Sequence, residues 1–198
     1  MIVIPPTIDE AVGHAADLYE EDLRRDGLVY SYTKLMAMNP EAHQAFEALI
    51  TAIVSSIGVR TYELATLGAA RGIPSPHCLL AHGLKTLRAE VLDEDQLERV
   101  ALDYETAGLS AADVAVMRFA EKMSTDAAAM TDADSQSLRD HGFSDRQIVD
   151  ITFAAGARNF FSRSLRALAV PVDDVPALSP RLAEALLSPL KHGPFSGG

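Results

Sequence analysis

The chain has little cysteine and no leader-like start. Cys78 is its only cysteine among 198 residues, so no disulfide can form within one chain. A chain without a disulfide framework is typical of a reducing compartment. The first residues, MIVIPPTIDE, show no basic segment before a long apolar one, which is the pattern a secretory signal needs. We therefore expect a cytoplasmic protein.

Positive charge and long apolar runs are also scarce. There are 17 Lys and Arg against 28 Asp and Glu, which gives a net charge of −11 and a pI near 4.9. This balance argues against nucleic acid or an anionic membrane surface as a partner. No uninterrupted stretch reaches the roughly 18 to 20 apolar residues of a membrane helix. We therefore expect no membrane span.

Strand patterns are nearly absent, while apolar residues recur at helical spacing throughout. The sequence predicts an all-α protein with a single domain over 1–198. Its core lies at about 40–125, and further helices lie at about 131–187. The expected helices are 7–26, 40–56, 59–71, 75–90, 93–107, 110–124, 131–140, 144–168 and 179–187.

Helix-start signals set most of these boundaries. A side chain that can cap a helix stands three residues before a second acceptor at five places, on or near the capping-box spacing. These pairs are Thr7 and Glu10, Asp93 and Gln96, Ser110 and Asp113, Thr131 and Asp134, and Ser144 and Gln147. Four glycines, Gly27, Gly72, Gly108 and Gly142, stand where helices are expected to end.

The stretch GIPSPHCLLAHG, residues 72–83, places the cysteine at a helix start. Ser75 is the expected N-cap and Pro76 the first helical residue. Cys78 then lies in the first turn, where free backbone N–H groups and the helix dipole stabilise a thiolate. His82 lies one turn further on the same face, where it could serve as a base or hydrogen-bond donor to the sulfur. The stretch predicts a reactive cysteine.

Glu63 lies on the preceding helix, in the mostly apolar segment ELATLGAA. If the two helices pack antiparallel, Glu63 lies about 12 Å from the end of its helix at ~1.5 Å per residue. His82 lies about 9 Å from the start of its own helix, nearly level with Glu63. A carboxylate at that height could orient the imidazole and raise its basicity.

Two other interpretations stay open on these residues. A lone cysteine in a helical protein is often a small core residue, and a lone histidine is often a packing residue. A metal site of His77, Cys78, His82 and Glu63 is disfavoured, because His77 and Cys78 are adjacent on a helix and point about 100° apart. We expect no metal and no cofactor.

The spacing of Glu63, Ser75, Cys78 and His82 resembles a known signature. It is the Glu–Cys-x-x-Cys-x-x-x-His pattern of the AhpD-like branch of the carboxymuconolactone decarboxylase superfamily, with serine at the first cysteine. The segment GFSDRQIVDITFAAGARNFFSRSLRALAV is similar to the C-terminal part of its longer, peroxidase-related members. The residues in familiar places there are Asn159, Phe160, Phe161 and Arg163. The resemblance spans roughly residues 30–170.

The resemblance implies an AhpD-like helical bundle that forms homo-oligomers, commonly dimers, trimers or hexamers. It implies thiol-dependent reduction of a small hydroperoxide, with Cys78 as the attacking thiol. Glu63, His77 and His82 match the proton relay, and Ser75 replaces the resolving cysteine. Because serine cannot form a disulfide, an external thiol would have to reduce an oxidised Cys78.

Three functions follow as hypotheses. The first is a one-cysteine peroxidase or thiol-dependent reductase. The second is a lactone decarboxylase or isomerase that uses His82 and Glu63 for proton transfer, with Cys78 incidental. The third is an oligomeric protein without catalysis. Phe160 and Phe161 could line a substrate pocket, although adjacent helical aromatics more often serve packing.

Ser75→Cys tests the resemblance directly. An N-cap residue and the third helical residue are close enough for a disulfide, which needs Cα atoms about 4.4 to 6.8 Å apart. Peroxide should therefore give an intramolecular disulfide, seen in intact mass as a loss of two hydrogens. The parent should instead show sulfenic acid, a mixed disulfide or over-oxidation. If the variant forms no disulfide and turns over no faster than the parent, this stretch shares only a helix start with the family.

Overall fold

The computed structural model describes residues 1–191, and in that part of the chain every regular element is a helix. The all-α prediction is therefore confirmed for the described residues. The helices are α1 (His14–Asp26), α2 (Ser31–Met36), α3 (Pro40–Gly72), α4 (Pro76–Arg88), α5 (Glu94–Asp103), α6 (Ala111–Thr125), η1 (Ala127–Ala129), α7 (Asp132–Asp140), α8 (Asp145–Ala167) and α9 (Pro180–Lys191).

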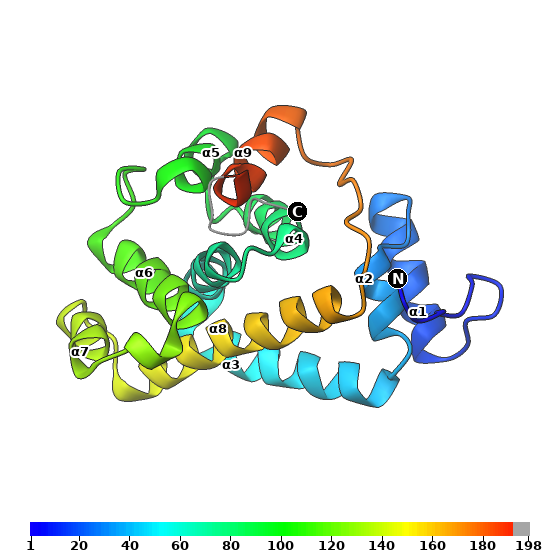
Figure 1. The fold of residues 1–198 in the computed structure, drawn as a ribbon, viewed down its shortest axis with the longest axis horizontal. Helices are drawn as coiled ribbons and strands as arrows, with labels where there is room; N and C mark the ends of the chain where they lie inside the picture. The colour runs from blue at the N-terminus through cyan, green and yellow to red at the C-terminus, as the bar shows by residue number, and fades with distance from the viewer. Residues whose placement is uncertain (192–198) are drawn as a thin grey trace.

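The second half of α3 is the centre of the fold. It packs against α4, α6 and α8, which surround it in Figure 1, while α5 and α9 pair above them. One apolar cluster lies among α3, α4, α5 and α9, and another among α3, α6 and α8. A small third cluster belongs to the α1–α2 region, at the opposite end of the view from α7. Every residue from Tyr62 to Ala70 is buried, so this part of α3 is the surface on which α4, α6 and α8 pack.

The capping signals account for most helix starts. Asn39, Ser75, Asp93, Ser110 and Ser144 each accept a hydrogen bond from the backbone N–H three residues later. These side chains satisfy N–H groups that a helix leaves unpaired at its start.

Gly58 divides α3 as the sequence predicts. Its φ of 76° and ψ of 161° are non-helical, so the helix bends between 40–57 and 59–72. This conformation is open to glycine because it has no Cβ.

The expected helix 7–26 begins too early. The Thr7 backbone N–H and hydroxyl both contact the Glu10 carboxylate, yet this pair closes a single turn. Gly13 then takes a φ of 57° and a ψ of −136°, which breaks the path, and α1 begins at His14. The sequence also gave no signal for α2, which has only six residues.

One property of α3 bears on the expectation of no membrane span. Among the described residues, α3 is long and apolar enough to cross a membrane by length and composition. The sequence criterion missed it because polar residues interrupt the apolar ones. Little of its most apolar window is buried in this chain, since the first half of α3 has an exposed outer face.

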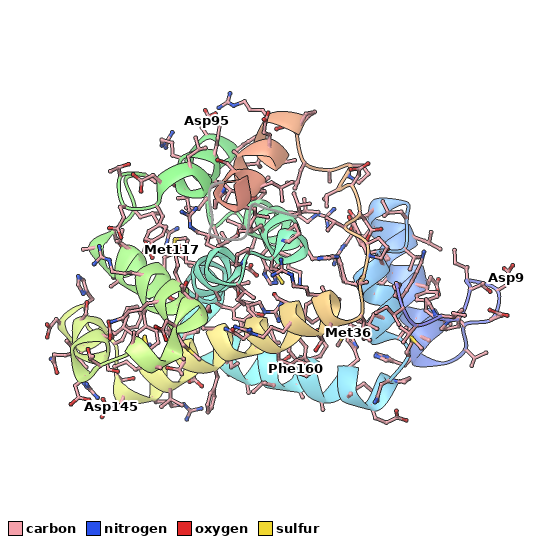
Figure 2. The ribbon with its side chains drawn as sticks, viewed as in Figure 1. Asp9, Met36, Asp95, Met117, Asp145 and Phe160 are labelled. Atoms are coloured by element: carbon pink, nitrogen blue, oxygen red, sulfur yellow. The ribbon has the colours of Figure 1, made fainter. Side chains whose placement is uncertain are left out.

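Gly68 allows α3 and α6 to approach closely. The Cβ of an alanine at 68 would lie 2.5 Å from the carbonyl oxygen of Met117, a residue labelled in Figure 2. Gly68→Ala should therefore lower the free energy of unfolding by about 1 to 3 kcal/mol, since backbone must shift. Chemical denaturation measures this change.

Gly156→Ala on α8 is the matched control. Its nearest neighbour to a new Cβ is Met123 Cε at 3.9 Å, so the methyl group fits. Alanine should be neutral or stabilising by about 0.5 to 1 kcal/mol in a helix interior. Equal effects of the two substitutions would contradict the close approach at Gly68.

Candidate active site at the α4–α8 seam

The Ser75–Pro76 start of α4 forms as the sequence predicts. Ser75 has extended backbone, and its hydroxyl accepts a hydrogen bond from the Cys78 backbone N–H at 3.5 Å. Cys78 therefore lies in the first turn of α4. Its side chain is only 2% exposed and packs in the core cluster with Leu79 and other apolar residues.

The partner of the sulfur is a hydroxyl on α8. Ser162 Oγ lies 3.0 Å from Cys78 Sγ, and both side chains are buried. The sequence suggested His82 for this contact, and that suggestion is wrong in this geometry. Both ring nitrogens of His82 are engaged elsewhere, so within residues 1–191 the Ser162 hydroxyl is the group that bonds the sulfur.

The level pairing of Glu63 with His82 is confirmed. Glu63 Oε2 lies 2.7 Å from His82 Nδ1. Both residues are buried, with exposed fractions of 5% for Glu63 and 2% for His82. The hairpin of α3 and α4 through residues 73–75 brings them to the same height. The contact thus joins two helices inside the core.

Arg158 on α8 completes this cluster. Its Nη1 lies 2.9 Å from His82 Nε2. A guanidinium can only donate, so Nε2 must accept and the imidazole proton is on Nδ1. His82 is therefore neutral here and donates from Nδ1 to Glu63.

Burial is the main cause that lowers the pKa of His82, to about 4, against the opposing effect of the Glu63 carboxylate. Burial raises the pKa of Glu63, but its contact with His82 and the positive charges of Lys85 and Arg158 outweigh burial and lower it. At neutral pH the cluster thus holds an ionised Glu63, a neutral His82 and a charged Arg158.

Arg158 and Ser162 were missed by sequence reasoning. They lie four residues apart on one face of α8 and meet His82 and Cys78, which lie four residues apart on α4. We call these four residues the α4–α8 seam. Two polar residues at helical spacing on the otherwise apolar buried face of α8 were the available signal.

His77 is not brought into the cluster. Its Nε2 lies 2.9 Å from the Pro171 carbonyl oxygen and donates to it, so the ring ties α4 to the segment after α8. Among residues 1–191, no group of three or more His, Cys, Asp or Glu side chains is arranged to hold a metal ion.

The two ends of the seam open to different cavities. A cavity of about 510 Å³ is lined by Glu63 and Arg158, among other residues. A cavity of about 190 Å³ is lined by Ser75, His77 and Ser162, among others. The two cavities share no lining residue, and neither Cys78 nor His82 lines either of them.

The two adjacent aromatic residues of α8, Phe160 and Phe161, have different surroundings. Phe161 lines the 510 Å³ cavity and stacks on Phe46, with ring centroids 5.7 Å apart. Phe160, labelled in Figure 2, is 58% exposed. Nearby, Asn159 donates to Ser124 Oγ at 2.9 Å, and Arg163 Nε donates to Asn159 Oδ1 at 3.3 Å. Asn159 and Arg163 thus act in helix packing.

Comparisons with solved structures match this fold over most of its length. An uncharacterized peroxidase-related protein from Silicibacter sp. TM1040 has a TM-score of 0.71 and 27% identity, over 87% of this chain and 91% of its own. A peroxidase-related protein with an alkylhydroperoxidase AhpD core, from Ralstonia eutropha JMP134, has a TM-score of 0.74 and 21% identity, over 87% and 92%.

A third solved structure has a different activity in its title. It is a Cys-to-Ala variant of the debrominase Bmp8 in complex with 2,3,4-tribromopyrrole, with a TM-score of 0.73 and 17% identity. The match covers 95% of this chain and 96% of that one. No family model matches the sequence, and no curated protein matches it.

The neutral state of His82 predicts a pH dependence of stability. Because its pKa falls from about 6.5 when unfolded to about 4 when folded, only the unfolded chain gains this proton between those values. His82 thus contributes stability that is fully present above about pH 6.5 and is lost as pH falls toward 4, at up to about 1.4 kcal/mol per pH unit.

His82→Gln isolates this contribution. Glutamine offers one N–H group and one carbonyl in place of the imidazole and does not titrate between pH 4 and 7. Denaturation at several pH values should show a shallower slope for this variant than for the parent. His141→Gln, at an exposed site, should leave the slope unchanged. Parallel slopes for the parent and His82→Gln would contradict the assignment.

Proposed function

Because this chain belongs to the AhpD-like superfamily, we propose that it is an oxidoreductase that reduces a small hydroperoxide through Cys78, with an external thiol as reductant. The observation that carries the proposal is the setting of the sulfur. Cys78 lies in the first turn of α4, with Ser162 Oγ 3.0 Å from Sγ.

Both features of this setting can stabilise negative charge that develops on the sulfur during attack. The first turn of a helix presents its positive dipole end to the sulfur. When the thiol ionises, the Ser162 hydroxyl can turn to donate to the sulfur, and hydrogen bonds to charged groups are the stronger ones. Ser162 also lines the 190 Å³ cavity, so a small molecule in that cavity would lie beside the hydrogen-bond partner of the sulfur.

The proposed reaction has three balanced steps. The Cys78 sulfur attacks the hydroperoxide, the O–O bond breaks, and sulfenic acid and an alcohol form. A first external thiol condenses with the sulfenic acid, which releases water and leaves a mixed disulfide. A second external thiol displaces Cys78 as a thiol and leaves as the oxidised disulfide. Ser75 cannot take the place of either external thiol.

The hydrogen-bonded chain of Glu63, His82 and Arg158 holds the helix that carries Cys78 in place. It has no hydrogen bond to Sγ among the described residues, but it fixes α4 against α8 one turn away. In this role Glu63, His82 and Arg158 are positioning residues. His77 holds the segment after α8 and takes no part in proton transfer in this proposal.

A second candidate is acid–base chemistry on a lactone or a related small molecule, with Cys78 incidental. The observation that favours it is that Glu63 and Arg158 line the 510 Å³ cavity, whereas Cys78 lines neither cavity. The Glu63 carboxylate would be the base there, because His82 Nε2 is occupied by Arg158. The debrominase among the similar structures indicates that this fold is compatible with reactions other than peroxide reduction. Turnover of a lactone by Cys78→Ala would favour this candidate.

We further propose that the protein works as a homo-oligomer in the cytoplasm. Three apolar side chains on α8 support this, since Val149, Phe153 and Phe160 are 47%, 51% and 58% exposed and follow helical spacing. Exposed apolar stripes of this kind are typical of subunit interfaces. A non-catalytic oligomer would share this property and would lack peroxide consumption.

Peroxide oxidation of Cys78 tests the first proposal. Intact mass after brief exposure should show addition of one oxygen, and an added thiol should convert it to a mixed disulfide and then to the parent mass. Cys78→Ser should show neither change. No oxygen on the parent while the protein stays folded would overturn the proposal and favour the core role of Cys78.

Ser162→Ala tests the contact that carries it. Loss of a hydrogen bond to a charged sulfur should slow oxidation about tenfold or more. Ser164→Ala is the control on the same helix, since its Oγ bonds only the Phe160 carbonyl oxygen. Equal rates in the two variants would remove Ser162 from the mechanism.

A further inference from the structure

The 510 Å³ cavity has walls from helices that lie far apart in the sequence. Residues of α1 and α2 close one side, including Met36, which Figure 2 labels, and α3, α4 and α8 supply the rest. Its volume falls within the range of small-molecule sites. About half of its lining residues are aromatic or aliphatic, including the rings of Tyr32, Phe46, Tyr62 and Phe161, and most of the others are charged.

Arg158 is buried in this wall without an anionic partner. The residue is 4% exposed, and its guanidinium carbon lies 5.2 Å from the ring centroids of both Phe46 and Phe161. Its one hydrogen bond goes to the neutral His82, and its Nε has no partner. No carboxylate among the described residues forms an ion pair with it. A buried charge normally has a counter-charge.

The other charged residues of the cavity differ in their direct contacts. Each of its carboxylates already has a partner. Glu21 pairs with Arg25, Asp22 accepts from the Tyr30 N–H, Glu47 contacts His43, and Glu63 accepts from His82. Lys85, in contrast, has no hydrogen bond or ion pair with the described residues. Lys85 and Arg158 therefore face this cavity without a direct ion pair, while both of their charges act on the Glu63 carboxylate.

We propose that this cavity binds a small organic monocarboxylate with an aromatic or compact apolar body. The carboxylate is held by Arg158 and Lys85, and the body packs against Phe46, Phe161 and the tyrosines. A guanidinium with free N–H groups suits a carboxylate in particular, because the two planar groups match in geometry. The net charge of −11 disfavours a polyanion in the same place.

The proposal goes beyond the thiol reaction and does not depend on it. Cys78 does not line this cavity, so the binding of a carboxylate and the oxidation of the sulfur are separate properties. The Cys78→Ser variant should bind the carboxylate as the parent does. Failure of one experiment therefore leaves the result of the other intact.

Calorimetric titration of the full chain with benzoate tests the proposal, with benzamide as the neutral probe of the same shape. Benzoate should bind saturably and at least about tenfold more tightly than benzamide, because only the anion pairs with the two cations. Arg158→Gln and Lys85→Gln should each weaken benzoate about tenfold or more, and should leave benzamide unchanged. Arg99→Gln removes an exposed charge on α5 that does not line the cavity, so it is the matched control and should change neither affinity.

Three results would overturn the proposal. These are equal affinity for benzoate and benzamide, no binding of either, or benzoate affinity unaffected by Lys85→Gln. Lys85 is exposed, so its substitution keeps the fold even if Arg158→Gln does not. The lysine variant therefore decides the outcome in that case.

Discussion

The hydrogen bonds from Arg158 through His82 to Glu63 constrain the rest of the site. Arginine can only donate, so the imidazole between it and the carboxylate must stay neutral and keep one tautomer. The chain joins α8, α4 and α3 inside the core, where each of the two charged groups would be costly alone. Fixing α4 against α8 at this point determines which α8 residue meets the sulfur one turn away. The contact of Cys78 with Ser162 therefore depends on a cluster that does not touch the sulfur.

Local features of the fold could be predicted from the sequence because they depend on neighbours within one turn. Ser75, Asp93 and Ser144 each start a helix through a bond to the third residue onward. The pairing of Glu63 with His82 could also be predicted. In an antiparallel pair of helices, two residues at similar distances from the connecting turn lie at the same level along the helix axes. The capping contact at Thr7 was misleading, because Gly13, six residues later, breaks the helical path before α1 begins.

The rest of the site depends on contacts between distant parts of the chain. Ser162 and Arg158 lie about eighty residues beyond the α4 residues they bond, and no local spacing connects the two helices. The assignment of His82 to the sulfur followed from helical spacing alone and failed because Arg158 occupies its free nitrogen. Phe160 and Phe161 are neighbours in sequence, but one faces solvent and the other a cavity, since adjacent helical side chains diverge by about 100°.

The separation of the two cavities has a kinetic meaning. Since they share no lining residue, a molecule in the larger one does not block entry to the smaller one beside Ser75 and Ser162. Two small molecules can be held at once, in either order of arrival. A carboxylate in the larger cavity can therefore stay bound while Cys78 passes through its own cycle, in which the alcohol leaves before the first thiol reacts.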